Sequence, residues 1–304
     1  MYFKIHMSTI VGFIACITHL TAEVDSSNLS PSQAHEQIQK DIHHQTQQAK
    51  DEVQKNLVPE AISIVEDTKR AINFIKSKQN AEALSALERA TGKSDILLAR
   101  HPRSALLPVD FIIRVSDVAP TDLNEINGIE MLIKRAINHK NYPSSRALLN
   151  LLRSEIHVTI DCLPLAYYPE VLKEAARLLE LNQPSEACLA LETALNTLVV
   201  LDQIFPIPLI KAIALLNAAE GNLEKERNKE NALKLVNKAH FELRRSIELG
   251  YLEKNSEEHR SLNEKFADLE NKIKSDQKAT SVFQSLKDKF RDFLRFFSKP
   301  KSAY

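Results

Sequence analysis

The ten histidines of this chain are the residues that most readily suggest acid–base or metal chemistry. His35, His43 and His44 lie close together near the N-terminal end, and neutral imidazoles are common metal ligands. Adjacent histidines in a polar stretch are more often solvated, so we expect no metal there. His139 and His157 lie near expected helix-to-strand transitions, where each is either a proton-sensitive contact or an ordinary packing or surface residue.

Carboxylates beside two apolar stretches are the second candidates for catalysis. Asp110, Asp117 and Asp161 border these stretches, and paired carboxylates can act as general acid and base. Aspartates at strand edges also keep an edge soluble or cap a turn. The sequence has no glycine-rich nucleotide loop, no CxxC or HExxH motif and no nucleophile elbow. We therefore predict no catalytic, cofactor-binding or metal-binding residue, and no cofactor.

The first residues indicate export. Residues 1–22 combine a weakly basic start, a short apolar run and a small residue for cleavage, as in a secretory signal peptide. The expected location is the periplasm or outside the cell, with a lipoprotein anchored at Cys16 as the less favoured alternative. An oxidising compartment could pair Cys162 with Cys188, but two unpaired thiols are the favoured interpretation.

Composition narrows the class of protein. The numbers of basic and acidic residues are equal, 40 of each, so no overall field attracts nucleic acid, and we predict no nucleic-acid partner. Only five glycines occur in 304 residues, which argues against phosphate-binding loops and against a large β fold. The expected class is therefore a largely helical globular protein.

A duplicated stretch gives the strongest indication of the architecture. Residues Thr68–Pro102 and Leu172–Pro206 align without a gap, and each predicts a helix, a tight turn and a second helix. Small and apolar positions recur in both copies and let the two helices of each hairpin approach closely. The matching pairs include Ala83/Ala187, Ala86/Ala190, Leu87/Leu191, Ala90/Ala194 and Leu97/Leu201.

Two segments instead alternate apolar and polar residues, as strands do. These segments are Val109–Val115 and Ile156–Cys162, with helices expected between them at about 122–138 and 144–154. An antiparallel helix pair returns the chain to its starting end, so the second strand should run opposite to the first. We predict a mainly α fold in which helical hairpin repeats surround one core, with a small two-stranded antiparallel β-ribbon. Ile204–Pro208 is expected to break the second copy.

The chain divides into four parts by composition. After the signal peptide, residues 23–56 form a polar Gln/His-rich extension that is expected to be loose and solvated. Residues 57–251 form the helical domain, and residues 252–304 form a helical C-terminal arm. The arm begins with a heptad seam, which predicts either a short coiled coil or one helix packed on the body: Leu262, Phe266, Leu269 and Ile273.

The end of the C-terminal arm is amphipathic and basic. Its apolar side consists of Phe283, Leu286, Phe290, Phe293, Leu294 and Phe297. Arg291 and Arg295 add positive charge beside this face. Such a profile fits a helix that lies on a membrane surface, and it also fits a helix docked on its own protein or on a partner.

Several segments are similar to a known family. They read EALSALERATGK (Glu82–Lys93), LLPVDF (Leu106–Phe111), SRALLNLLRSEIHVTIDCLPLAYYP (Ser145–Pro169), EAARLLELNQPSEACLALETAL (Glu174–Leu195) and ELRRSIELGY (Glu242–Tyr251). Together they resemble the YfdX family of bacterial proteins over about Leu57–Tyr251. The resemblance implies exported, mainly helical proteins that oligomerise and are linked to acid and drug stress. It implies no established catalytic activity and supplies no catalytic residues.

The expected function is therefore a non-enzymatic, stress-associated exported scaffold or binding protein that forms a homo-oligomer. One alternative is a peripheral membrane protein held by the C-terminal helix, which could equally bind a protein partner. Another is a small-molecule-binding protein or a hydrolase with a dispersed site, because helical bundles can open apolar pockets. The sequence does not identify a ligand.

Overall fold

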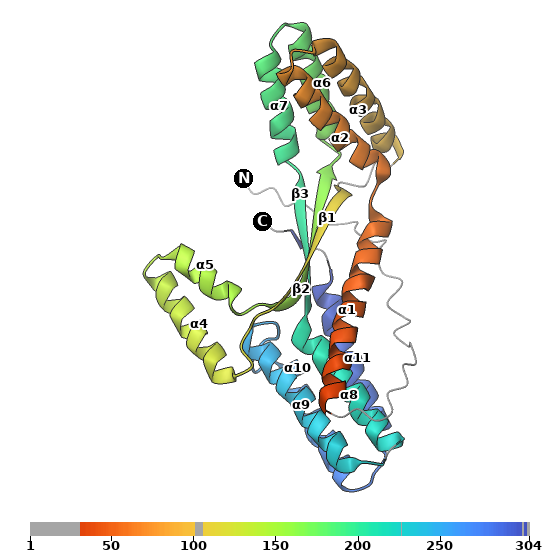
Figure 1. The fold of residues 1–304 in the computed structure, drawn as a ribbon, viewed down its shortest axis with the longest axis vertical. Coiled ribbons are helices and arrows are strands. Elements are labelled where there is room, and N and C mark those ends of the chain that lie inside the picture. Colours follow the sequence, from red (N-terminus) through yellow and green to blue (C-terminus); the bar gives the residue numbers. More distant parts are fainter. Residues whose placement is uncertain (1–30, 101–105, 226, 300, 303–304) are drawn as a thin grey trace.

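The computed structural model describes residues 31–100, 106–225, 227–299 and 301–302. These residues form eleven helices and a small antiparallel sheet, so the mainly helical fold is confirmed. The sheet lies in the middle of an elongated molecule, with one group of helices at each end (Figure 1). A further pair of helices projects sideways from the sheet and meets one of the two groups near its root (Figure 1).

A four-helix bundle forms one end of the molecule. Its helices are α2 (Pro59–Lys76), α3 (Asn80–Arg100), α6 (Tyr168–Glu180) and α7 (Pro184–Asn196). Each copy of the duplicated stretch supplies one helical hairpin, and the two hairpins pack on each other through α3 against α6 and α2 against α7. Ala83 and Ala187, at matching positions, are fully buried, as expected for residues that allow close helix approach.

The sheet has one more long strand than the predicted ribbon. Its order is β1 (Leu106–Asp117), β2 (Ser154–Pro164), β3 (Val199–Pro206) and the two-residue β4 (Lys301–Ser302), all neighbours antiparallel. The β1–β2 pairing is the predicted ribbon. The expectation of two strands was wrong because the second copy leaves its helix at Asn196 and continues as β3, whereas the first copy stays helical to Arg100. The valines, isoleucine and phenylalanine of β3 suit a strand that pairs with β2.

Helix α1 (Pro31–Asn56) covers one face of this sheet, which we call the inner face (Figure 1). Ile42, Ala49 and Val53 of α1 are buried against the inner face, which includes Ile156 and Val158 of β2. The expectation that this polar stretch is loose and solvated was therefore wrong for α1, which is helical and buries apolar residues against the sheet. The apolar positions of α1 recur every four and seven residues, which is enough for one narrow stripe.

The other end of the molecule contains α8 (Ile207–Glu224), α9 (Lys229–Glu248), α10 (Glu257–Lys274) and α11 (Thr280–Phe297). The heptad seam of α10 is buried in this helical group, so α10 packs on the body. Gly250 follows α9 with φ +81°, the left-handed conformation that ends helices. The buried apolar residues form three clusters, one in the bundle, one beneath the sheet and one among α8–α11. The prediction of a single core was therefore wrong.

Candidate interaction surface

A helical hairpin projects from the end of the β1–β2 ribbon. It consists of α4 (Leu123–Asn138) and α5 (Tyr142–Asn150), and we call it the projecting hairpin. Both helices begin at side-chain caps, because Asp122 accepts a hydrogen bond from the backbone of Asn124 and Asn141 accepts one from Ser144. The hairpin is therefore a well-formed local unit that extends away from α1 and from the bundle (Figure 1).

The projecting hairpin exposes much of its apolar surface. Within its two helices only Ile126, Ile133 and Ser145 are buried. Large apolar side chains that are exposed on or just after it are Met131, Leu132, Ile137, Tyr142, Leu149 and Leu151. Single exposed apolar residues are ordinary on a protein surface, but a concentration on one small unit marks an interaction site.

One buried arginine fixes the root of the projecting hairpin. Arg245 of α9 is 1% exposed and donates hydrogen bonds to the backbone oxygens of Ala119 (2.8 Å) and Pro120 (3.0 Å). Its guanidinium also lies 3.5 Å from Asp117 and 3.4 Å from Glu242. These contacts hold the segment between β1 and α4 against α9, so the hairpin leaves the body at a defined position.

Asp117 belongs to the same network at the root. Lys211 binds its carboxylate at 2.8 Å and the Ser154 hydroxyl donates to it at 2.7 Å. Burial alone would raise the pKa of Asp117, but these hydrogen bonds and the charges of Lys211 and Arg245 outweigh it, so the pKa is lowered. Asp117 is therefore an ionised anchor and has no feature of an acid catalyst.

The sheet face opposite α1, the outer face, contains polar and charged side chains. Asp110 of β1 lies directly across from Asp161 of β2. Burial and the neighbouring Asp110 charge raise the pKa of Asp161, although Lys69 partly counters them. Further along this face, Asp202 lies 2.8 Å from the His157 Nε2 atom and accepts a hydrogen bond from Thr159. Asp110, His157 and Asp161 therefore lie on the predicted ribbon. Asp202 was not predicted as part of this face, because it belongs to β3, which was not predicted.

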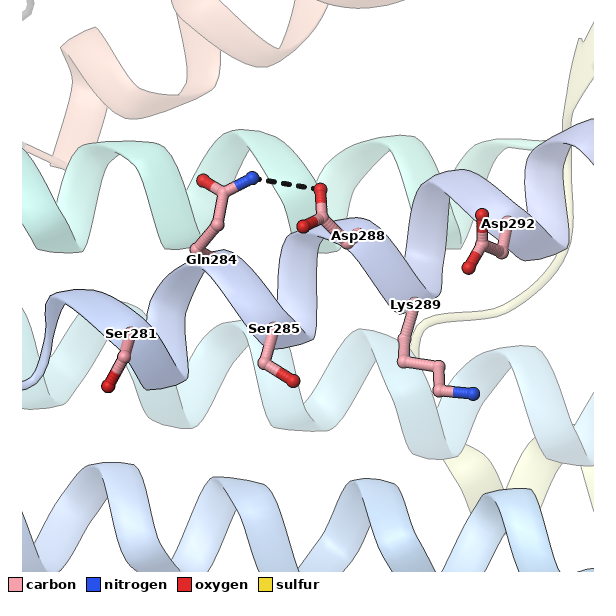
Figure 2. Close-up of a pocket in the computed structure, with 6 residues that line it drawn as sticks. All are labelled: Ser281, Gln284, Ser285, Asp288, Lys289 and Asp292. Atoms are coloured by element: carbon pink, nitrogen blue, oxygen red, sulfur yellow. Dashed lines mark hydrogen bonds between the residues drawn. The ribbon is translucent and has the colours of Figure 1, made fainter.

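The hollow shown in Figure 2 lies along α11. It is lined by Ser281, Gln284, Ser285, Asp288, Lys289 and Asp292, which all belong to this one helix. Within the helix Gln284 donates to Asp288 at 2.8 Å and Asp288 binds Arg291 at 2.9 Å, while Ser285 accepts a hydrogen bond from Lys265 of α10. An active site normally brings polar groups together from several elements, and this hollow does not. In the described part of the chain, no three His, Cys, Asp or Glu side chains lie close enough to hold a metal.

The predicted amphipathic face of α11 points into the protein. Phe283, Leu286 and Phe290 are buried among α8–α11, and Phe293, Leu294 and Phe297 pack partly buried against the same cluster. Arg291 pairs with Asp288 at 2.9 Å and Arg295 with Asp292 at 3.1 Å on the polar side. Of the two interpretations of this helix, the structure shows the docked arrangement, with Phe283, Leu286 and Phe290 buried in the protein.

The remaining candidate residues do not assemble into a site. His43 and His44 are exposed on α1, the side chain of His35 lies outside the described residues, and His139 ends α4. Cys162 and Cys188 are free thiols, and burial raises the pKa of Cys162 to about 12, so it is an inert packing group. The predicted signal peptide, residues 1–22, lies outside the described residues together with its Cys16. Among the described helices, none has the length and apolar character needed to cross a bilayer.

The middle of the chain matches a known protein family. Residues 64–204 match the family model described as YfdX protein. This part of the chain belongs to the YfdX family. The YfdX segment spans both bundle hairpins, the projecting hairpin and nearly all of β1–β3, and it is narrower than the stretch of resemblance seen in the sequence. Helix α1 and helices α8–α11 lie outside it.

A solved structure of Salmonella Typhi YfdX is similar to this chain at 13% identity. The alignment covers 50% of this chain and 93% of that chain, with a TM-score of 0.34. No curated protein matches the chain.

Proposed function

We propose that this protein is an exported, stress-associated scaffold that works by binding and not by catalysis, and that it self-associates. The observation that carries the proposal is the projecting hairpin, which presents six large exposed apolar residues on a unit with three buried ones. A fixed root at Arg245 supports this role, because a binding element that is held in place loses less entropy on association.

Membership of the YfdX segment in its family supports the same class, since the resemblance implies exported proteins that oligomerise. The exposed apolar side chains of the projecting hairpin support a binding role. The ionisable clusters at Arg245 and at Asp67 are closed ion-pair networks that stabilise the fold.

Sedimentation velocity of the full chain over a range of concentrations tests self-association. We expect a concentration-dependent dimer or larger oligomer, and we expect the Met131→Glu/Leu132→Glu variant to shift to monomer because two charges replace exposed apolar contacts. Leu181→Glu is the matched control, since Leu181 lies on the bundle and its exposure, 55%, is between those of Met131 (67%) and Leu132 (47%). A wild-type chain that stays monomeric at about 100 μM would contradict the proposal, as specific oligomers usually form well below this concentration.

A further inference from the structure

The outer face of the sheet lacks a helical cover. Helix α1 packs on the inner face, whereas the outer positions are exposed or half-buried over 110–114 of β1, 157–161 of β2 and 200–204 of β3. Ile112 of β1 is 47% exposed in the middle of this face. The face has three carboxylates, Asp110, Asp161 and Asp202, against one guanidinium, Arg114, and so has an acidic excess.

The two neighbouring carboxylates on this face, Asp110 and Asp161, repel each other. Like charges directly opposite each other on neighbouring strands are unfavourable, and Asp110 and Asp161 have this arrangement. Within the described residues neither carboxylate makes an ion pair, and the charge of Lys69 on α2 only partly offsets the repulsion at Asp161. A cation placed over the pair would relieve the repulsion.

The projecting hairpin has the complementary charge. Its helices and turn contain four basic residues, Lys134, Arg135, Lys140 and Arg146, against the two acidic residues Glu125 and Glu130. Lys134 pairs with Glu130 at 2.7 Å, but the other three cations make no ion pair within the described part of the chain. Arg135 follows Met131 by four residues and Leu132 by three, so this cation shares a helix face with exposed apolar side chains.

The projecting hairpin and α1 lie on opposite sides of the molecule (Figure 1). The outer face is the sheet face that α1 leaves uncovered. In a pair of copies related by a two-fold axis, each hairpin can therefore reach the other copy's outer face, and the two contacts form together. Contact between two hairpins would instead bring two basic surfaces together.

We propose that the occupant of the outer sheet face is a second copy of this chain: the projecting hairpin of each copy packs on the Asp110–Asp161 face of the other. Met131 and Leu132 cover Ile112, and the unpaired cations of the hairpin approach the acidic pair. This inference rests on the proposed self-association and adds which surfaces meet.

Two blocked variants and their mixture test the reciprocal contact. The hairpin-blocked chain has Met131→Glu, Leu132→Glu and Arg135→Glu, and the sheet-blocked chain has Asp110→Lys and Ile112→Lys. All five substituted residues are exposed, and circular dichroism checks that both variants keep the wild-type helix content. Leu189→Glu on the bundle, where Leu189 is 64% exposed, is the control for adding charge at an exposed apolar residue.

We expect sedimentation velocity to show each variant alone at least about tenfold weaker in self-association than wild type, which corresponds to the loss of about 1.4 kcal/mol. We expect an equimolar mixture to form a heterodimer, because the intact hairpin of one variant meets the intact face of the other. Leu189→Glu should associate like wild type.

Other outcomes overturn the inference in distinguishable ways. If the sheet-blocked chain associates like wild type while the hairpin-blocked chain does not, hairpins contact each other, so self-association stands and the sheet contact is wrong. A mixture that stays monomeric also overturns the reciprocal contact. A monomeric wild-type chain removes the proposed self-association and the inference with it.

Discussion

A single buried carboxylate illustrates how residues stabilise the bundle. Asp67 of α2 is 1% exposed, and Lys93 of α3 binds it at 2.8 Å. Arg89 and Arg70 lie 3.4 and 3.3 Å from the same group. Burial opposes the charge of Asp67, but its hydrogen bonds and ion pairs with Lys93 and Arg89 outweigh burial, so its pKa is lowered.

The lowered pKa predicts how an Asp67→Asn variant depends on pH. Because the pKa is lower in the folded protein, the charged form stabilises the fold above the unfolded pKa of about 4, and this contribution disappears as the pH falls through the folded pKa. Urea unfolding should show a loss of about 1–3 kcal/mol at pH 7. The difference between variant and wild type should shrink toward pH 3; an unchanged difference would show that Asp67 acts through packing alone.

Few of the residue-level contacts could be predicted from the sequence. Asp110, Asp161 and His157 were placed beside a strand because alternation over seven residues is a local signal. The partners of Asp67 and Arg245 were not predictable, since Arg245 binds Ala119 from a helix more than a hundred residues away in the chain. Such contacts depend on how the two ends of the molecule pack against the sheet, which no local pattern encodes.

Among the elements, α11 shows that amphipathic character alone does not decide what a helix contacts. Its face was equally consistent with a membrane, a partner and the protein itself. In the structure Phe290 is 0% exposed and lies in the cluster of α8–α11. The face therefore contributes to folding, and a membrane could reach it only if the helix detached.

Phe290→Ala should destabilise the protein by about 3–5 kcal/mol, because it removes a buried aromatic ring and leaves a cavity. Phe296→Ala is the control on the same helix, since Phe296 is 55% exposed, and it should cost less than about 1 kcal/mol. Urea unfolding measures both. Flotation of the wild-type chain with anionic liposomes, or equal destabilisation by the two variants, would contradict the docked position of α11.

The missed elements have physical explanations. Strand β3 was not predicted because its sequence aligns with the end of α3, which is helical. The second copy is extended over Val199–Pro206 because this segment pairs with β2. Helix α1 was underestimated because its stripe is narrow and its surroundings are polar, so burial against a sheet could not be inferred. The strand pair, the bundle helices and the projecting helices were predictable, since each has a clear period.

At the scale of the whole molecule, three apolar clusters stabilise three regions, and the projecting hairpin belongs to none of them. Ile126 and Ile133 are the only apolar residues that its two described helices bury, so most of its apolar surface contributes little to the stability of the monomer. We therefore expect that removing the hairpin lowers the stability of the rest of the protein only a little.

Replacing residues 122–151 by Asn-Gly should leave the body folded, since residues 118–121, this dipeptide and residues 152–153 make a short loop that still joins the antiparallel strands β1 and β2. We expect the urea midpoint to stay close to that of the monomeric Met131→Glu/Leu132→Glu variant, and circular dichroism to lose only the helix signal of α4 and α5. Keeping Ala119 and Pro120 preserves the hydrogen bonds of Arg245. Collapse of the body would show that the hairpin is part of its core.

The order of elements along the chain has a consequence for biosynthesis. The bundle needs both of its hairpins, but α2–α3 leaves the ribosome well before α6–α7, because β1, the projecting hairpin and β2 are made in between. During that interval the apolar side of the first hairpin has nothing to pack on. A nascent chain in this state is prone to aggregate, so a holding chaperone is expected to bind it until translation passes residue 196.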